Sequence, residues 1–125
     1  TKAILSNNSN LKKILKIVHD QVRKKMNLFL KKNKRKKIII LDIPLLLENK
    51  INNKKDILVF VESSKKDIKK GLKKRPNFNK KLLKKFKKIQ FTPTYKKRKA
   101  KFIIKNKFTK KSVNVGIKNI LNQIL

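Results

Sequence analysis

Residues 38–48, Ile-Ile-Ile-Leu-Asp-Ile-Pro-Leu-Leu-Leu-Glu, carry the clearest structural signal in this chain. Four apolar residues follow a lysine run and predict a strand that is covered on both faces, as in a parallel sheet between helices. Pro44 lacks an N–H and favours extended geometry at Ile43, so we expect the strand to end near Asp42. Ligands bind at the carboxyl ends of parallel strands. Asp42 is therefore a candidate for holding a metal or a substrate hydroxyl; the alternative is that it only caps the next segment.

The rest of the chain alternates helical patterns with two further apolar runs, which is typical of an α/β fold. Apolar residues at steps of three and four between Leu11 and Leu30 predict an amphipathic helix, and the asparagines before it can serve as N-caps. Ser63 and Ser64 can cap a second, short helix. The expected elements are helices over 9–31, 65–74, 82–89 and 113–124, a helical turn at 95–99, and strands at 38–42, 57–61 and 102–104.

Composition limits the class of protein. With 125 residues and a mass of 14.8 kDa, the chain is long enough for one domain with a core. Because cysteine is absent, disulfides, thiol chemistry and cysteine-ligated zinc are excluded. No apolar run approaches the roughly 18–20 residues of a membrane span. We therefore expect a cytoplasmic protein without membrane contact.

The formal net charge of +33 comes from 39 basic residues, of which only Arg23, Arg35, Arg75 and Arg98 are arginine. So many cations bind polyphosphates through counterion release, and nonspecific polyanion binding is expected at low salt. Specific recognition of phosphates or bases usually favours the planar guanidinium group over the lysine ammonium. Because the lysines are spread over the whole length, we interpret them mainly as residues that fill surface positions.

Four short motifs follow one another along the chain. They are Ile17-Val18-His19 with Val22-Arg23, the segment 42–48, Arg75-Pro76 with the later Gln90, and Lys96-Lys97, Ala100, Phe102-Ile103-Ile104 and Asn106. In this order they resemble the dephospho-CoA kinase family, the P-loop kinases of the last step in coenzyme A synthesis. The likeness is to the family's Ile-x-His-Pro-x-Val-Arg segment, its Asp-x-Pro-Leu-Leu-Phe-Glu signature, its mobile lid and its closing Lys-Arg-x-x-Ala-Asp-Phe-Val-Ile-Asp-Asn run. It extends over essentially the whole sequence.

Parts of the family pattern are missing. The family's first strand and its phosphate loop, Gly-x-x-x-x-Gly-Lys-Ser/Thr, are absent from these residues, whose two glycines are Gly71 and Gly116. The N-terminal carboxylate that the family is taken to use on the acceptor hydroxyl is absent too, and Lys101 and Lys105 replace two aspartates. Thr1 is accordingly interpreted as a cut end rather than a true start.

For the fold, the resemblance implies an α/β domain with a partial P-loop kinase-type parallel sheet, flanking helices and a missing central first strand. That strand would lie between the strands at Ile38 and Ile57, so its loss would expose sheet edges and apolar surface. The expected parts of this truncated domain are an acceptor-side helix (1–36), the strands and helix of the core (37–74), a lid (75–99), and a last strand with the C-terminal helix (100–125).

For the activity, the resemblance implies transfer of the ATP γ-phosphate to the ribose 3′-hydroxyl of dephospho-CoA, with Mg²⁺ bound together with ATP. Such catalysis consists mainly of positioning and charge neutralisation. Asp42 would hold Mg²⁺ through water or orient the acceptor, and Arg75 would reach the ATP phosphates when the lid closes. The resemblance assigns the acceptor pocket to His19, Arg23, Pro44, Leu45 and Glu48, and nucleotide binding to Arg75, Lys97 and Asn106.

Several of these residues have a plainer interpretation. Arg75 can be a solvated helix end, and His19 can be a hydrogen-bonded packing residue on its helix. Leu45 can pack in the core, and Asn106 can belong to a backbone turn. Lys97 can be one of the many lysines that fill the surface without a role in phosphate binding.

Two other classes of function stay open. The charge suggests a basic RNA- or ribosome-binding module, although the phenylalanines follow apolar patterns and are not placed as a base-stacking platform. The other class is a noncatalytic remnant that serves only as a packing partner. Because the phosphate loop is missing, we expect these 125 residues alone not to transfer phosphate from ATP.

Overall fold

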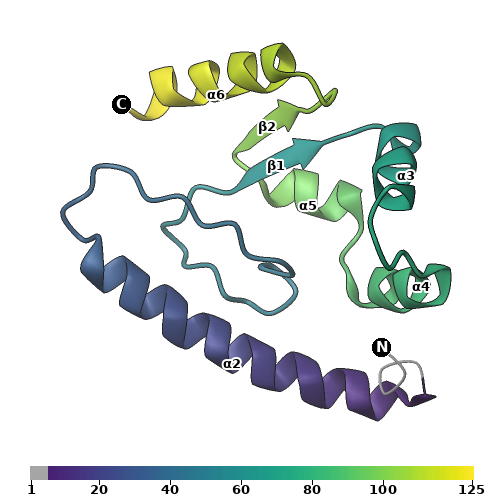
Figure 1. Ribbon diagram of the computed structural model, residues 1–125. Helices are drawn as coiled ribbons and strands as arrows, with labels where there is room; N and C mark the ends of the chain where they lie inside the picture. Colours follow the sequence, from purple (N-terminus) through teal and green to yellow (C-terminus); the bar gives the residue numbers. More distant parts are fainter. Residues whose placement is uncertain (1–5) are drawn as a thin grey trace. The chain divides into compact units, whose positions relative to one another are not determined.

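Helix α2 (Asn8–Lys32) dominates the first part of the computed structural model, which describes residues 6–125; Thr1 lies outside the described residues (Figure 1). The remaining elements, in chain order, are β1 (Val59–Glu62), α3 (Lys65–Lys73), α4 (Lys80–Ile89), α5 (Pro93–Lys99), β2 (Phe102–Lys105) and α6 (Lys110–Ile124). They form two compact units. The α2 unit comprises residues up to 52 together with 80–90, and the sheet unit comprises 53–79 together with 91–125.

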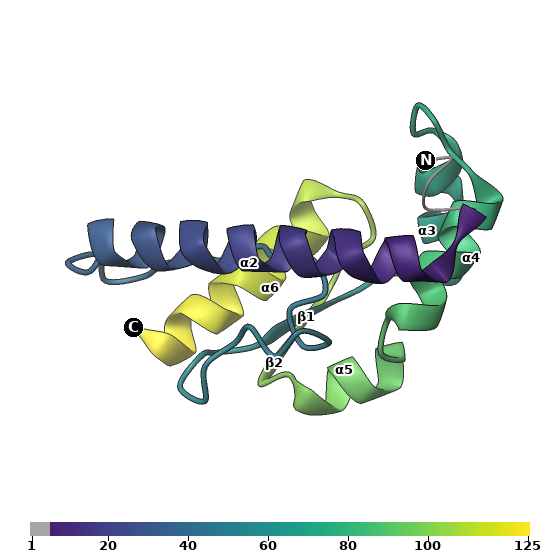
Figure 2. The ribbon, with the colours of Figure 1, turned by 90° about the horizontal axis from the view of Figure 1, so that it is seen from below.

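The expected N-terminal amphipathic helix is confirmed as α2. Its N-cap is Asn7, whose side-chain oxygen accepts a hydrogen bond of 2.8 Å from the backbone N–H of Ser9. Lys31 and Lys32 lie in the last turn, where positive charge complements the helix dipole. Leu11, on the apolar stripe, is only 5% exposed. Figure 2 shows that the helix runs without a sharp kink, as expected for a segment without glycine or proline.

The strand predicted at 38–42 is wrong. Residues 38–43 form no strand, and no backbone hydrogen bond joins them to other described residues. Exposed and half-buried residues alternate along this segment, and Ile40 is 83% exposed, so the segment is covered on one side at most. The physical reason is that a strand requires a neighbouring strand for its ladder, and no described segment pairs with these residues.

A short helical turn at 44–50 follows this segment and ends in a Schellman motif. The N–H of Ile51 donates to the carbonyl of Leu46 at 3.0 Å, and the N–H of Lys50 donates to that of Leu47 at 3.2 Å. Lys50 has φ 50°, the left-handed conformation that this motif requires and that glycine usually supplies. Ile51, just after it, is 3% exposed. The end of the turn is thus anchored by a buried side chain.

Helix α4 completes the α2 unit and begins two residues before the expected start. Its apolar stripe is half-buried while all but one of its lysines are exposed, in agreement with the predicted amphipathic pattern. The helix ends at Ile89, as expected, and Pro93 occupies the first turn of α5, where its missing N–H costs no hydrogen bond.

The sheet unit is built on a two-stranded parallel sheet, β1–β2, with Val59 opposite Phe102 and Val61 opposite Ile104. Paired residues of a parallel ladder point to the same face. Helix α6 covers that face over β2, where Ile104 is 8% exposed, whereas Val61 on β1 is 55% exposed (Figure 1). The α/β fold with a partial parallel sheet is therefore confirmed, and apolar surface is exposed along β1.

Helix starts in the sheet unit follow ordinary capping rules. Ser64, Thr92 and Thr109 are the N-caps of α3, α5 and α6, and each side-chain oxygen accepts a backbone N–H bond. Ser64 had been identified from sequence as a candidate cap. All the described lysines are exposed except Lys85 and Lys96, which are half-buried.

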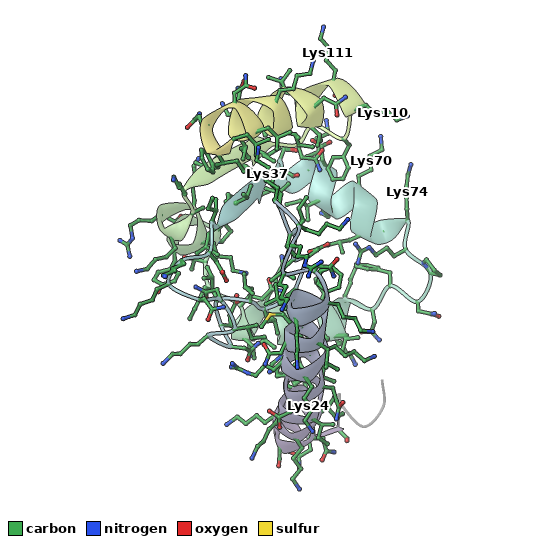
Figure 3. The ribbon with its side chains drawn as sticks, turned by 90° about the vertical axis from the view of Figure 1, so that its left-hand side faces the viewer. Lys24, Lys37, Lys70, Lys74, Lys110 and Lys111 are labelled. Atoms are coloured by element: carbon green, nitrogen blue, oxygen red, sulfur yellow. The ribbon has the colours of Figure 1, made fainter. Side chains whose placement is uncertain are left out.

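Figure 3 shows the side chains of Lys70 and Lys111 extending away from their helices, and that of Lys74 extending away from the end of α3. This agrees with lysine as a surface-filling residue. Of the helices that the structure describes, none has both the length and the apolar content needed to cross a bilayer.

Candidate functional site

A basic stripe runs along one face of α2. Lys12, Lys16, His19 and Arg23 are separated by steps of four, three and four residues, so they lie on the same side of the helix. His19 is half-buried and the other three side chains are exposed. The stripe places three cations and an imidazole within about three helical turns, an arrangement suited to an anionic ligand.

The turn at 44–50 is fastened to this stripe through Asn49. The guanidinium of Arg23 donates to the backbone oxygen of Asn49 at 2.6 Å. The side-chain nitrogen of Asn49 lies 2.9 Å from Nε2 of His19 and donates to the carbonyl oxygen of Leu45 at 2.8 Å. These contacts hold His19 and Arg23 of α2 against the turn at 44–50.

An open pocket of about 330 Å³ lies over this junction. Asn49 contributes one wall, and α2 contributes the rest, namely Lys12, Leu15, Lys16, His19, Asp20 and Arg23. Asp20 provides the one carboxylate among these lining residues. The pocket is therefore equipped to bind phosphate-like groups and, next to them, a hydroxyl or amino group that donates to a carboxylate.

Three further acceptor-side candidates lie on the same turn but do not line the pocket. Pro44 is exposed, and Leu45 and Glu48 are half-buried. Leu45 has φ 55°, a left-handed conformation that is uncommon for leucine, and its carbonyl oxygen accepts from both the backbone N–H and the side chain of Asn49. Leu45 thus shapes the site through its backbone.

Asp42 lies just before this turn, and its side chain is exposed. Among the described residues, no three histidine or carboxylate side chains gather as metal ligands. Mg²⁺ usually keeps several waters and takes one or two carboxylates in addition to substrate phosphates. A single exposed carboxylate such as Asp42 fits that mode of binding, whereas a cage made by the protein alone does not occur in this part of the chain.

The nucleotide-side candidates belong to the sheet unit. Arg75 is exposed in the turn between α3 and α4, where its backbone N–H donates to the carbonyl of Leu72. Lys97, on α5, forms an ion pair of 2.7 Å with Glu62 at the end of β1. The hydrogen bond from Lys97 holds the pKa of Glu62 below its ordinary value against the opposing effect of desolvation, and the charges of Lys97 and Lys105 add to the lowering.

Asn106 follows β2 directly and forms a turn. Its N–H donates to the carbonyl of Glu62 at 2.8 Å, and its side-chain oxygen accepts from the N–H of Phe108 at 2.7 Å. Phe108 has φ 59°, and the turn redirects the chain from β2 into α6. Asn106 thus takes part in a backbone turn at the end of β2.

Of the residues that line this pocket, sequence reasoning named His19 and Arg23 but not Asn49, Lys12 and Lys16. The two lysines carry a signal, because they share the helical spacing of His19 and Arg23. Asn49 carries none, because its position depends on a turn with two non-glycine residues in the left-handed conformation.

Comparison with known proteins shows which family the chain belongs to. Residues 1–111 match the family model of dephospho-CoA kinase. A dephospho-CoA kinase of Wolbachia pipientis wMel is 29% identical over 126 residues, an alignment that covers 99% of this chain and 64% of the relative. The chain thus spans just under two thirds of the length of that relative. This chain belongs to the dephospho-CoA kinase family.

Proposed function

We propose that this chain supplies the acceptor side and the lid of a dephospho-CoA kinase, an ATP-binding transferase of coenzyme A biosynthesis. The reaction is transfer of the γ-phosphate of ATP to the ribose 3′-hydroxyl of dephospho-CoA. Family membership supports the kinase class. The observation that carries the acceptor-side assignment is the junction at which Asn49 joins His19 and Arg23 to the turn of residues 44–50.

In this proposal the pocket over α2 receives the acceptor. Arg23, Lys12 and Lys16 neutralise phosphate groups of dephospho-CoA, and His19 supplies a hydrogen bond. Pro44, Leu45 and Glu48 belong to the turn that carries Asn49, and they would shape the pocket through the position of that turn. These residues orient the acceptor and therefore contribute mainly to its affinity.

The phosphoryl-transfer side of the proposal rests on Asp42, Arg75, Lys97 and Asn106. Mg²⁺, when bound with ATP, neutralises charge on the transferring phosphoryl group. Asp42 would hold this ion or orient the acceptor hydroxyl, and Arg75 would pair with ATP phosphates. Lys97 would assist phosphate binding, and Asn106 would border the adenine.

Calorimetric titration of this chain with dephospho-CoA tests the acceptor site. Arg23→Gln is expected to weaken binding by about tenfold or more, because a charged hydrogen-bonding group contributes about 1.5–3 kcal/mol. Lys24→Gln is the matched control. It removes the same charge from the adjacent position of α2, outside the pocket, and is expected to have a much smaller effect. Equal losses in both variants would contradict the proposed site.

We also propose that these residues do not transfer phosphate from ATP by themselves, because they contain no Gly-x-x-x-x-Gly-Lys-Ser/Thr segment. Mg²⁺-dependent phosphorylation of dephospho-CoA by the 125-residue chain would refute that statement. A cytoplasmic location is part of the same proposal.

A further inference from the structure

The amide of Asn49 has one possible orientation in this site. Its side-chain nitrogen lies 2.8 Å from the carbonyl oxygen of Leu45 and 2.9 Å from Nε2 of His19. If the amide were turned over, its oxygen would face the Leu45 carbonyl oxygen at hydrogen-bond distance, and neither atom can donate. The Leu45 carbonyl therefore requires the nitrogen, whose two hydrogens serve Leu45 and His19.

This orientation determines which nitrogen of His19 carries the proton. Nε2 faces an N–H donor, so it must accept, and the proton of the neutral ring is on Nδ1. No hydrogen bond from Nδ1 to another described residue accompanies this contact, and the described side chains include no buried polar atom without a partner. Because His19 is half-buried and its unbonded Nδ1 is not among buried polar atoms, Nδ1–H is accessible from solvent.

The backbone of Asn49 makes two further hydrogen bonds. Arg23 donates to its carbonyl oxygen at 2.6 Å, and the N–H of Asn49 donates to Leu45 at 3.1 Å. Three hydrogen bonds thus hold the residue whose side chain contacts His19. Such restraint is the usual way in which a neighbouring group sets the tautomer of a functional histidine.

We infer that Asn49 is a positioning residue that keeps neutral His19 in the Nδ1–H tautomer, so that the pocket presents an N–H donor to a phosphate oxygen beside Lys12, Lys16 and Arg23. The tautomer follows from the hydrogen bonds alone. The ligand part, a phosphate or pyrophosphate group, rests on the proposed function.

The experiment is magnetic resonance on the chain with isotope-labelled histidine. His19 is the sole histidine, so one pair of ring-nitrogen signals reports on the site without assignment. In mildly alkaline solution, a long-range proton–nitrogen spectrum is expected to show Nδ1 protonated and Nε2 unprotonated. A predominantly Nε2–H ring would overturn the inference.

Two variants distinguish whether Asn49 sets the tautomer of His19 or only packs against it. Asn49→Asp keeps the shape but offers only acceptor oxygens, so the ring proton is expected to move to Nε2. Asn52→Asp introduces the same charge three residues away and is expected to leave the tautomer unchanged. Circular dichroism verifies that both variants fold. If the tautomer is the same in Asn49→Asp and in the unsubstituted chain, Asn49 does not set it.

Inorganic pyrophosphate at physiological salt tests the ligand part. It is expected to shift the Nδ1–H signal, with an affinity about tenfold lower in Asn49→Ala than in the unsubstituted chain. If the ring is in the Nδ1–H tautomer but pyrophosphate does not shift the Nδ1–H signal, the assignment of a phosphate ligand is overturned and the tautomer assignment stands. Failure of the Arg23→Gln titration with dephospho-CoA, with both results here as expected, would instead count against the proposed function.

Discussion

Gly116 of α6 lies so close to Ile104 of β2 that a methyl group at the glycine would meet three side-chain atoms of Ile104 at 3.0–3.3 Å. Ile104 is buried, and its branched Cβ is fixed to the strand, so it has little freedom to retreat. Overpacking costs about 1–3 kcal/mol, whereas alanine gains about 1 kcal/mol of helix propensity. We predict that Gly116→Ala lowers the free energy of unfolding by about 1 kcal/mol in urea titrations.

Gly71 provides the matched control in the same unit. It lies within α3, and a methyl group there would meet no atom within 4 Å. Gly71→Ala is therefore expected to raise the free energy of unfolding by about 0.5–1 kcal/mol through helix propensity alone. If both substitutions stabilise the chain equally, the close packing of α6 on β2 is contradicted.

Lys50→Gly is predicted to stabilise the turn at the acceptor site. Lys50 holds φ 50°, which costs an L-residue about 1–2 kcal/mol and costs glycine almost nothing. Part of this gain is lost because glycine is more flexible in the unfolded chain. We expect a net increase of about 1 kcal/mol or less in the free energy of unfolding. Lys54→Gly, at a loop residue without positive φ, is expected to destabilise, by about 0.5 kcal/mol.

The Glu62–Lys97 ion pair predicts a dependence of stability on pH. Because the pKa of Glu62 is lowered in the folded state, its stabilising contribution is complete above the ordinary value of 4.5 and is lost as the pH falls through the lower folded-state value. The stability difference between the unsubstituted chain and Lys97→Met should therefore shrink in acid. Lys118→Met, on α6, should show no such trend in denaturant titrations at several pH values.

Binding to unstructured RNA is predicted to be strong only at low salt. If six or more phosphates are neutralised, affinity should fall by about 10³-fold between roughly 50 and 200 mM salt. Fluorescence anisotropy with homopolymers of different base composition measures this slope. Selectivity for one sequence that persists at physiological salt would favour the RNA-binding module over simple charge attraction.

Helices could be predicted well because their signals are local. The steps of three and four between Leu11 and Leu30 lie within α2, and Ser64 lies where a cap was expected. The strands near Val59 and Phe102 were also anticipated within two residues. Each of these elements depends on neighbours a few positions away along the chain.

The errors arose where the structure depends on distant partners. Ile38–Leu41 has the composition of a buried strand, but a ladder needs a second strand that composition cannot guarantee. Asn49 was missed because Leu45 and Lys50 adopt left-handed conformations for which their sequence gives no signal. Its contact with His19 then joins residues 30 positions apart.

The unpaired segment at 38–43 also bears on how this chain behaves in concentrated solution. A short β-branched run with free backbone groups and an exposed Ile40 is the kind of sequence that stacks into cross-β aggregates. Lys36 and Lys37 on one side and Asp42 on the other act as gatekeepers, since stacking would bring like charges into register. The colloidal stability of the protein thus depends on electrostatic repulsion, and high ionic strength would remove that protection.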